Sequence, residues 1–138
     1  MLTPSSATAD YFGGMARVMP CQAVVDERGS LTPVNFEALG FQARRLALIS
    51  AHDGCRRGGH AHRQGAQLLV CVSGVVDVEM RHLGEQAMVQ LRPGVNALYI
   101  ASPVWACQTY RGAQPGLLVL SDFDFDPDGY CDSEEAVT

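Results

Sequence analysis

Short apolar segments recur along the chain at intervals of roughly ten residues, with glycine and proline between them. The clearest segment alternates, because Val76, Val78 and Met80 take every second position and the acidic Asp77 and Glu79 take the positions between. Side chains of a strand point to its two faces in turn, so this order predicts a strand with one buried and one polar face. No stretch has the period of a long amphipathic helix. The pattern therefore predicts an all-β fold, an antiparallel sandwich or barrel.

Turn-forming residues divide the predicted strands. Residues 26–30 supply one turn, Ser73 and Gly74 are expected to form a tight turn, and residues 112–116 form a connection. Residues 36–39 predict a single helical turn, which Gly40 ends. The expected strands are residues 17–19, 22–25, 31–34, 45–50, 67–72, 75–80, 87–91, 96–100, 106–110 and 117–120.

The length of 138 residues is that of one domain. Residues 1–14 contain paired serines and paired glycines, which predict a flexible N-terminal arm. Residues 15–132 are expected to form the folded domain. Residues 133–138 are expected to form an acidic C-terminal tail.

Composition narrows the class of function. The net charge is −5, and all ten basic residues are arginines that form no basic run. Such a protein is a poor candidate for binding nucleic acid or a membrane, so neither partner is expected. The five cysteines form no C-x-x-C pair, which argues against disulfides and a thiolate zinc site. Without a recognisable signal peptide or membrane-spanning apolar run, the sequence predicts a cytoplasmic protein.

Candidate chemistry is concentrated in residues 55–63. This stretch holds Arg56, Arg57 and Arg63 beside His60 and His62. On a strand, the His-x-His spacing places both imidazoles on one face. Two imidazoles flanked by arginines suit proton transfer, metal binding or anion binding, and the residues alone leave these three open.

The spacing from Gly54 through His60 and His62 to Gln67 and Gly74 resembles the first signature motif of cupins. That resemblance implies an antiparallel double-stranded β-helix, also called a jelly roll. Metal-dependent cupins have a glutamate where this chain has Gln67, and a later histidine that residues 98–110 lack. Because two imidazoles and a neutral amide bind a divalent cation weakly, no metal is expected.

A longer series resembles one family within the cupins. It runs from Asp26-x-Arg28-Gly29-Ser30-Leu31 through Arg45, the segment 57–62 and the segment 67–74 to Trp105 and residues 117–120. This series is similar to the sugar-nucleotide 3,4-ketoisomerases, which include the C-terminal domain of WxcM-like proteins. The resemblance implies isomerisation of a dTDP-linked 4-keto-6-deoxyglucose to its 3-keto form for glycan or lipopolysaccharide synthesis. It also implies no cofactor, no metal, and a homodimer that exchanges N-terminal strands.

The resemblance implies roles for particular residues. His60 and His62 match the active-site histidines, with His62 expected as the principal base and His60 as the relay. Arg57 is expected to stabilise the enediolate or to hold a diphosphate oxygen. The expected substrate-binding residues are Arg28, Ser30, Arg45, Gln67, Tyr99, Trp105 and Tyr130.

The chain departs from the family where the cavity is expected. Ala47 and Leu48 replace a tyrosine pair, and Ala106 and Cys107 replace a polar pair after the tryptophan. A tyrosine elsewhere could substitute, and the candidates are Tyr99, Tyr110 and Tyr130. Two other functions stay open: an RmlC-type sugar-nucleotide epimerase, and a non-catalytic cupin that binds a sugar nucleotide. The missing tyrosines favour the non-catalytic alternative.

Overall fold

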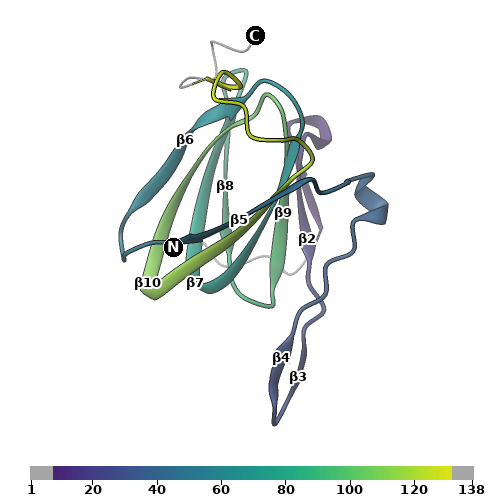
Figure 1. Ribbon diagram of the computed structural model, residues 1–138, viewed down its shortest axis with the longest axis vertical. Helices are drawn as coiled ribbons and strands as arrows, with labels where there is room; N and C mark the ends of the chain where they lie inside the picture. Colours follow the sequence, from purple (N-terminus) through teal and green to yellow (C-terminus); the bar gives the residue numbers. More distant parts are fainter. Residues whose placement is uncertain (1–7, 132–138) are drawn as a thin grey trace.

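The computed structural model describes residues 8–131, and the predictions for residues 1–7 and 132–138 lie outside that range. Strands dominate the described chain, and helical structure is limited to two short 3₁₀ turns (Figure 1). The elements are β1 (Ala9–Tyr11), η1 (Phe12–Gly14), β2 (Ala16–Pro20), β3 (Val24–Asp26), β4 (Gly29–Leu31), η2 (Glu37–Leu39), β5 (Arg45–Ser50), β6 (Arg56–His62), β7 (Ala66–His82), β8 (Glu85–Leu91), β9 (Asn96–Ala101), β10 (Trp105–Ser121) and β11 (Tyr130–Cys131).

Two long strands, β7 and β10, join the two layers of the fold. The first part of β7 and the last part of β10 lie in one layer with β9, β2, β1 and β5. The last part of β7 and the first part of β10 lie in the other layer with β8, β6 and β11. All these pairings are antiparallel, which is the arrangement of the predicted jelly roll.

Two predicted turns are wrong. Ser73 and Gly74 do not reverse the chain, because β7 continues through them, and β10 likewise continues through residues 112–116. Both strands instead change register there, in β-bulges that bend each strand from one layer into the other. Gly74 has φ of 71°, and a Cβ on it would lie 2.6 Å from the Arg111 carbonyl oxygen. The glycine therefore permits a bulge between close strands, where the sequence predicts a hairpin turn.

The main core lies between the layers. The predicted alternation in residues 75–80 is confirmed, since Val76, Val78 and Met80 are fully buried. Each such side chain contributes about 1.5–3 kcal/mol relative to exposure. A second cluster, around Phe41 and Leu68, covers the outside of the layer that contains β9. Residues of the main core are Ala16, Val18, Leu69, Cys71, Val76, Val78, Met80, Val89, Leu91, Leu98, Ile100, Val104, Ala106, Tyr110, Leu117 and Val119.

Part of the predicted N-terminal arm has regular structure. Residues 9–11 form β1 and pair with β2, and Tyr11 and Phe12 pack against the main core. Farther along, β3 and β4 form a hairpin that projects from the body of the molecule (Figure 1). At its tip the Asp26 carboxylate accepts a hydrogen bond from the Arg28 backbone N–H at 2.9 Å. The predicted turn at residues 26–30 is therefore present, but it lies away from the body of the fold.

Two further findings bear on the predicted setting of the protein. Within residues 8–131, no helix has the length and apolar character needed to cross a bilayer. None of the five cysteines, all of which lie within residues 8–131, forms a disulfide, and burial raises the pKa of Cys21 and Cys71. A cytoplasmic location stays a prediction of the sequence.

Candidate active site

Strand β6 brings the predicted histidine pair to one end of the jelly roll. His60 pairs with Ala106 of β10, which is buried in the core, so His60 and His62 face the interior. Their rings are 5.2 Å apart at 89°. Gly58 and Gly59, at φ of 84° and 77°, form the irregularity that precedes them. Only glycine adopts such angles without strain, so the double glycine sets the direction in which His60 points.

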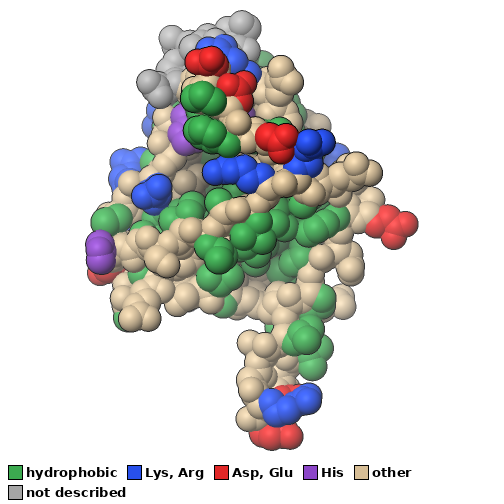
Figure 2. Space-filling view, in the orientation of Figure 1, with side chains coloured by type: hydrophobic (Ala, Val, Ile, Leu, Met, Phe, Trp, Pro, Cys, Tyr) green, Lys and Arg blue, Asp and Glu red, His purple; other side chains and the backbone are tan. Residues whose placement is uncertain are grey.

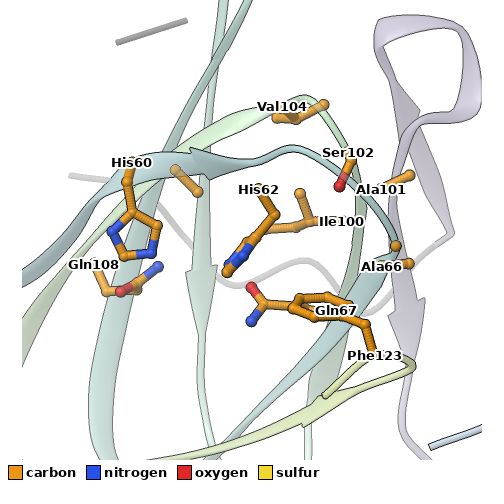
Figure 3. A pocket seen from close by; sticks show the side chains of 12 residues that line it. His60, His62, Ala66, Gln67, Ile100, Ala101, Ser102, Val104, Gln108 and Phe123 are labelled. Atoms are coloured by element: carbon orange, nitrogen blue, oxygen red, sulfur yellow. The ribbon is translucent and has the colours of Figure 1, made fainter. Parts of the chain in front are cut away.

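Aromatic rings cover the imidazoles. The Tyr130 ring lies 4.6 Å from the His60 ring and 4.8 Å from the His62 ring, and the Phe123 ring lies 5.0 Å from that of His62. The space left free is about 20 Å³, room for roughly one water molecule. The pocket is lined by His60, His62, Gly65, Ala66, Gln67, Ile100, Ala101, Ser102, Val104, Ala106, Gln108 and Phe123 (Figure 3).

Burial keeps His62 neutral. Its pKa falls from 6.5 to about 4, mainly through burial and also through the charges of His60 and Arg45. A hydrogen bond to Gln67 opposes this fall, as expected when the amide oxygen accepts from the imidazole N–H. The Gln67 Nε2 donates to the Ser121 Oγ at 3.3 Å, which leaves the amide oxygen for His62. His62 is therefore an oriented, neutral imidazole at pH 7.

Arg45 and Arg57 approach the pocket from two strands. The Arg45 guanidinium lies 5.4 Å from the centre of the Phe125 ring, and it is close enough to lower the pKa of His62. Arg57 pairs with Gln108 across β6 and β10, so both side chains leave the sheet on the same side, although Arg57 is exposed and does not line the pocket. Arg45 thus lies near His62, and Arg57 lies on the same strand as both histidines, so an anionic ligand at this end of the fold would have two guanidinium groups within the two strands.

Four predicted binding residues are not brought to this pocket. Tyr99 lies on the opposite face of β9 from Ile100 and packs edge-on against Phe41, with ring centres 6.4 Å apart. Trp105 faces outward and lies beneath the Arg81 guanidinium, which is 5.0 Å from its ring. Arg28 and Ser30 lie on the projecting hairpin. Strand alternation opposes the predicted placement of Tyr99 and Trp105, because the residues beside them, Ile100 and Ala106, face the interior.

The structure adds pocket residues that sequence reasoning missed. Phe123 is expected only to pack the C-terminal segment, whereas its ring lies against His62. Gln108 lies between Ala106 and Tyr110 on the inward face of β10, so alternation along the predicted strand 106–110 could have identified it. Ser102 follows β9, and its buried hydroxyl has no hydrogen-bond partner among the described residues. No sequence pattern marks Ser102.

Metal ligands do not gather in the part of the chain that the structure describes. Among residues 8–131, no three His, Cys, Asp or Glu side chains are placed to hold a metal ion together. The arrangement that is present consists of two imidazoles, two neutral amides, two nearby guanidinium groups and a phenol. Such groups can move protons, hydrogen-bond a sugar and bind a phosphate.

Comparisons with known proteins agree with the predicted family. The profile of the FdtA family, WxcM-like, C-terminal, matches residues 15–137. A variant of the QdtA 3,4-ketoisomerase from Thermoanaerobacterium thermosaccharolyticum, in complex with TDP, is 26% identical, with a TM-score of 0.79 over 89% of this chain and 91% of that chain. The WlaRB TDP-quinovose 3,4-ketoisomerase from Campylobacter jejuni is also 26% identical, with a TM-score of 0.79 over 88% and 95%.

Epimerases of sugar nucleotides share the fold as well. The rmlC epimerase of Mycobacterium tuberculosis has a TM-score of 0.78 over 90% of this chain and 71% of its own, at 18% identity. None of the curated proteins matches the chain in sequence. The family profile spans nearly the whole chain, and it agrees with the jelly-roll topology and with the similarity to named isomerases. The predicted fold and isomerase family are therefore confirmed: the chain belongs to the FdtA (WxcM-like, C-terminal) family.

Proposed function

We propose that the protein is a metal-independent 3,4-ketoisomerase that converts a dTDP-linked 4-keto-6-deoxysugar into its 3-keto isomer. The observation that carries this proposal is the covered His60–His62 pair inside a jelly roll of the FdtA family. Named ketoisomerases with the same fold support the choice of substrate class.

The reaction is a proton relocation. A proton leaves C3, the hydroxyl proton passes from O3 to O4, and a proton arrives at C4 through an enediol, so no oxidant or reductant is consumed. A base must be unprotonated to begin, and His62 meets this condition because burial lowers its pKa to about 4. Negative charge developing on the enediolate would raise that pKa and strengthen the base as the proton moves. His60, whose ring lies against that of His62, serves as the relay.

Arginine and tyrosine side chains complete the mechanism. Arg45 lies near His62, and Arg57 lies on the strand that carries both histidines. We assign them to the diphosphate and the enediolate respectively. Of the three tyrosines considered as substitutes for the missing pair, Tyr130 contacts both imidazole rings. Tyr99 lies on the outer face, and Tyr110 is fully buried in the core. We therefore assign the proton-relay role of the missing tyrosines to Tyr130.

A homodimer with exchanged N-terminal strands belongs to the same proposal. The β3–β4 hairpin exposes Val24, Val25 and Leu31 by 60%, 74% and 63%. On the body of the molecule, hydrophobic side chains gather over β5 and its neighbours (Figure 2), where Leu46 and Leu48 are 56% and 72% exposed. Contact between copies would cover both apolar surfaces, and it would carry Arg28 and Ser30 toward the partner. Light scattering after gel filtration tests the dimer, and a monomer at micromolar concentration would refute it.

Proton exchange tests the reaction. The protein is incubated with dTDP-4-keto-6-deoxyglucose in deuterated water, and label at C3 and C4 is followed by NMR. Label at C4 of a 3-keto product supports isomerisation, whereas label at C3 with inverted configuration indicates an epimerase. Binding without exchange indicates a non-catalytic module. His62→Ala should lower exchange by a factor of about 100 or more while TDP affinity is retained, and normal exchange by this variant would refute the assignment of the base.

A further inference from the structure

Gln108 is a pocket residue to which no role has yet been given. It lies on β10 between Ala106 and Tyr110, and its amide stands beside the imidazole of His60 (Figure 3). Ala106 and Tyr110 are buried in the core, so the intervening Gln108 faces the interior at the end of the jelly roll where the histidines lie. A polar amide at such a position is unusual among apolar neighbours, because burying it without a hydrogen bond is costly.

The backbone opposite Gln108 is shaped to receive its amide. A Cβ on Gly58 would lie 2.8 Å from the Gln108 Oε1 and 3.2 Å from its Nε2. Side chains do not approach a Cβ so closely, so the amide occupies space that only a glycine leaves open. Gly58 also has φ of 84°, which a residue with a Cβ adopts only with strain. The glycine therefore leaves the space that the Gln108 amide occupies beside His60.

That amide still has its hydrogen-bonding capacity. Of the side-chain hydrogen bonds among residues 8–131, none engages Gln108, whereas the other pocket amide, Gln67, is bonded to Ser121. The Gln67 amide is thus committed to orienting His62. The Gln108 amide has donor hydrogens on Nε2 and an acceptor oxygen on Oε1 available to a ligand.

We propose that Gln108 is a sugar-binding and specificity-determining residue, which recognises the adjacent ketone and hydroxyl of the substrate. The inference rests on the proposed function, which supplies a sugar with a ketone at C4 and a hydroxyl at C3. These groups present an acceptor and a donor side by side, and a carboxamide presents the complementary donor and acceptor. The Nε2–H donates to the C4 oxygen, and Oε1 accepts from the C3 hydroxyl. The same N–H then stabilises the negative oxygen of the enediolate.

Comparing the affinity for TDP with the affinity for the complete sugar nucleotide separates recognition of the sugar from binding of the nucleotide. The affinities of the wild type, Gln108→Met and Gln108→Glu for TDP and for dTDP-4-keto-6-deoxyglucose are measured by calorimetry. Methionine has a similar length but cannot make the paired bonds, and a carboxylate accepts but cannot donate. Both variants should keep the wild-type affinity for TDP and should bind the sugar nucleotide about tenfold more weakly. Their kcat/KM for isomerisation should fall by about tenfold or more.

Two glycine variants supply a matched comparison. Gly58→Ala and Gly59→Ala both place a Cβ at positive φ, so both incur backbone strain of about 1–2 kcal/mol. The added Cβ at Gly58 meets the Gln108 amide and lies 3.1 Å from the Ala106 carbonyl oxygen, whereas at Gly59 the nearest atom is Trp105 Cζ2 at 4.0 Å. Gly58→Ala should lose the preference for the sugar nucleotide over TDP, and Gly59→Ala should keep it. The midpoint of denaturant unfolding verifies that each variant is folded under assay conditions.

The outcomes distinguish this inference from the proposed reaction. If the wild type prefers the sugar nucleotide but does not exchange protons, the ketoisomerase proposal fails, and the Gln108 variants still test recognition. If the wild type binds TDP and the sugar nucleotide equally, the inference about Gln108 is overturned. Unchanged preference in Gln108→Met also overturns it, as does equal loss of preference in the two glycine variants.

Discussion

Removing the imidazole of His62 should reduce the loss of folding stability that occurs between pH 6.5 and pH 4. The pKa of His62 is about 4 in the folded protein and lies below the ordinary value of 6.5. Between these two pH values His62 is therefore protonated in the unfolded chain but not in the folded protein. The resulting stability is complete above pH 6.5 and is lost as the pH falls from 6.5 toward 4. His62→Gln should eliminate this dependence, because glutamine keeps hydrogen-bonding capacity but does not titrate.

The size of the effect follows from the shift. The full difference between the two pKa values corresponds to roughly 3 kcal/mol. Near pH 5 the unfolded chain is protonated and the folded protein is not, which accounts for about 2 kcal/mol of that total. Because His62 is only partly buried, solvent screening reduces the expected value to about 1 kcal/mol. Unfolding by urea near pH 7.5 and near pH 5 measures the change for each protein.

A second histidine provides the control. His52 lies on the surface after β5 and away from the pocket lining, so His52→Gln should show the same change between the two pH values as the wild type. Comparing each variant with the wild type cancels the contribution of the carboxylates. If His62→Gln shows the same acid sensitivity as the wild type, burial does not keep His62 neutral, and the account of the base is wrong.

Three more substitutions test the surroundings of the pocket. Tyr110→Phe should raise the free energy of unfolding, measured in urea, by about 1 kcal/mol. The reason is that the buried Tyr110 hydroxyl has no hydrogen-bond partner within residues 8–131, and burial raises its pKa to about 12. A loss of stability would mean that the hydroxyl is hydrogen-bonded. Gly65→Ala would place a Cβ against the Phe123 ring, whereas Gly84 has a similar φ and open space around it. Gly65→Ala should therefore destabilise the folded protein more than Gly84→Ala does. Equal midpoints of denaturant unfolding in the two variants would contradict this packing. Gln67→Leu removes a hydrogen bond that raises the pKa of His62, so NMR titration should show a lower pKa, and an unchanged value would rule out the contact.

The alternating pattern was sufficient to predict the all-β fold and the interior position of Val76, Val78 and Met80. It also placed both imidazoles of the histidine pair on one face, because period-two geometry does not depend on distant neighbours. The bends in β7 and β10 could not be obtained in this way. Gly74 has the residue type and positive φ of a hairpin turn, yet long-range pairing makes it a bulge. Whether the glycine forms a hairpin turn or a bulge depends on the partner strands, which the local sequence does not specify.

Placement within the candidate site was harder to predict for the same reason. The series resembling the ketoisomerases suggested Tyr99 and Trp105, but the register of β9 and β10 turns both outward. Phe123 and Gln108 could be linked to the histidines only after distant strands were assembled. Gln67 lies at the pocket as predicted, because the short connection after β6 brings the start of β7, in the other layer, to the same end of the fold as the histidines.

The aromatic cover over the histidines has a consequence for timing. Phe123 and Tyr130 lie against the imidazoles, and the free space of the pocket is about 20 Å³, so under the proposed function a sugar reaches the histidines only if at least one of these rings moves. Both rings contact His62, whose pKa is lowered mainly by burial. Under that proposal, movement of the rings would expose the imidazole to water or to substrate oxygens and would raise its pKa, because burial is the main cause of the low value. Under the proposed function, the pKa of His62 would therefore be low in the ligand-free protein and higher once the sugar is bound.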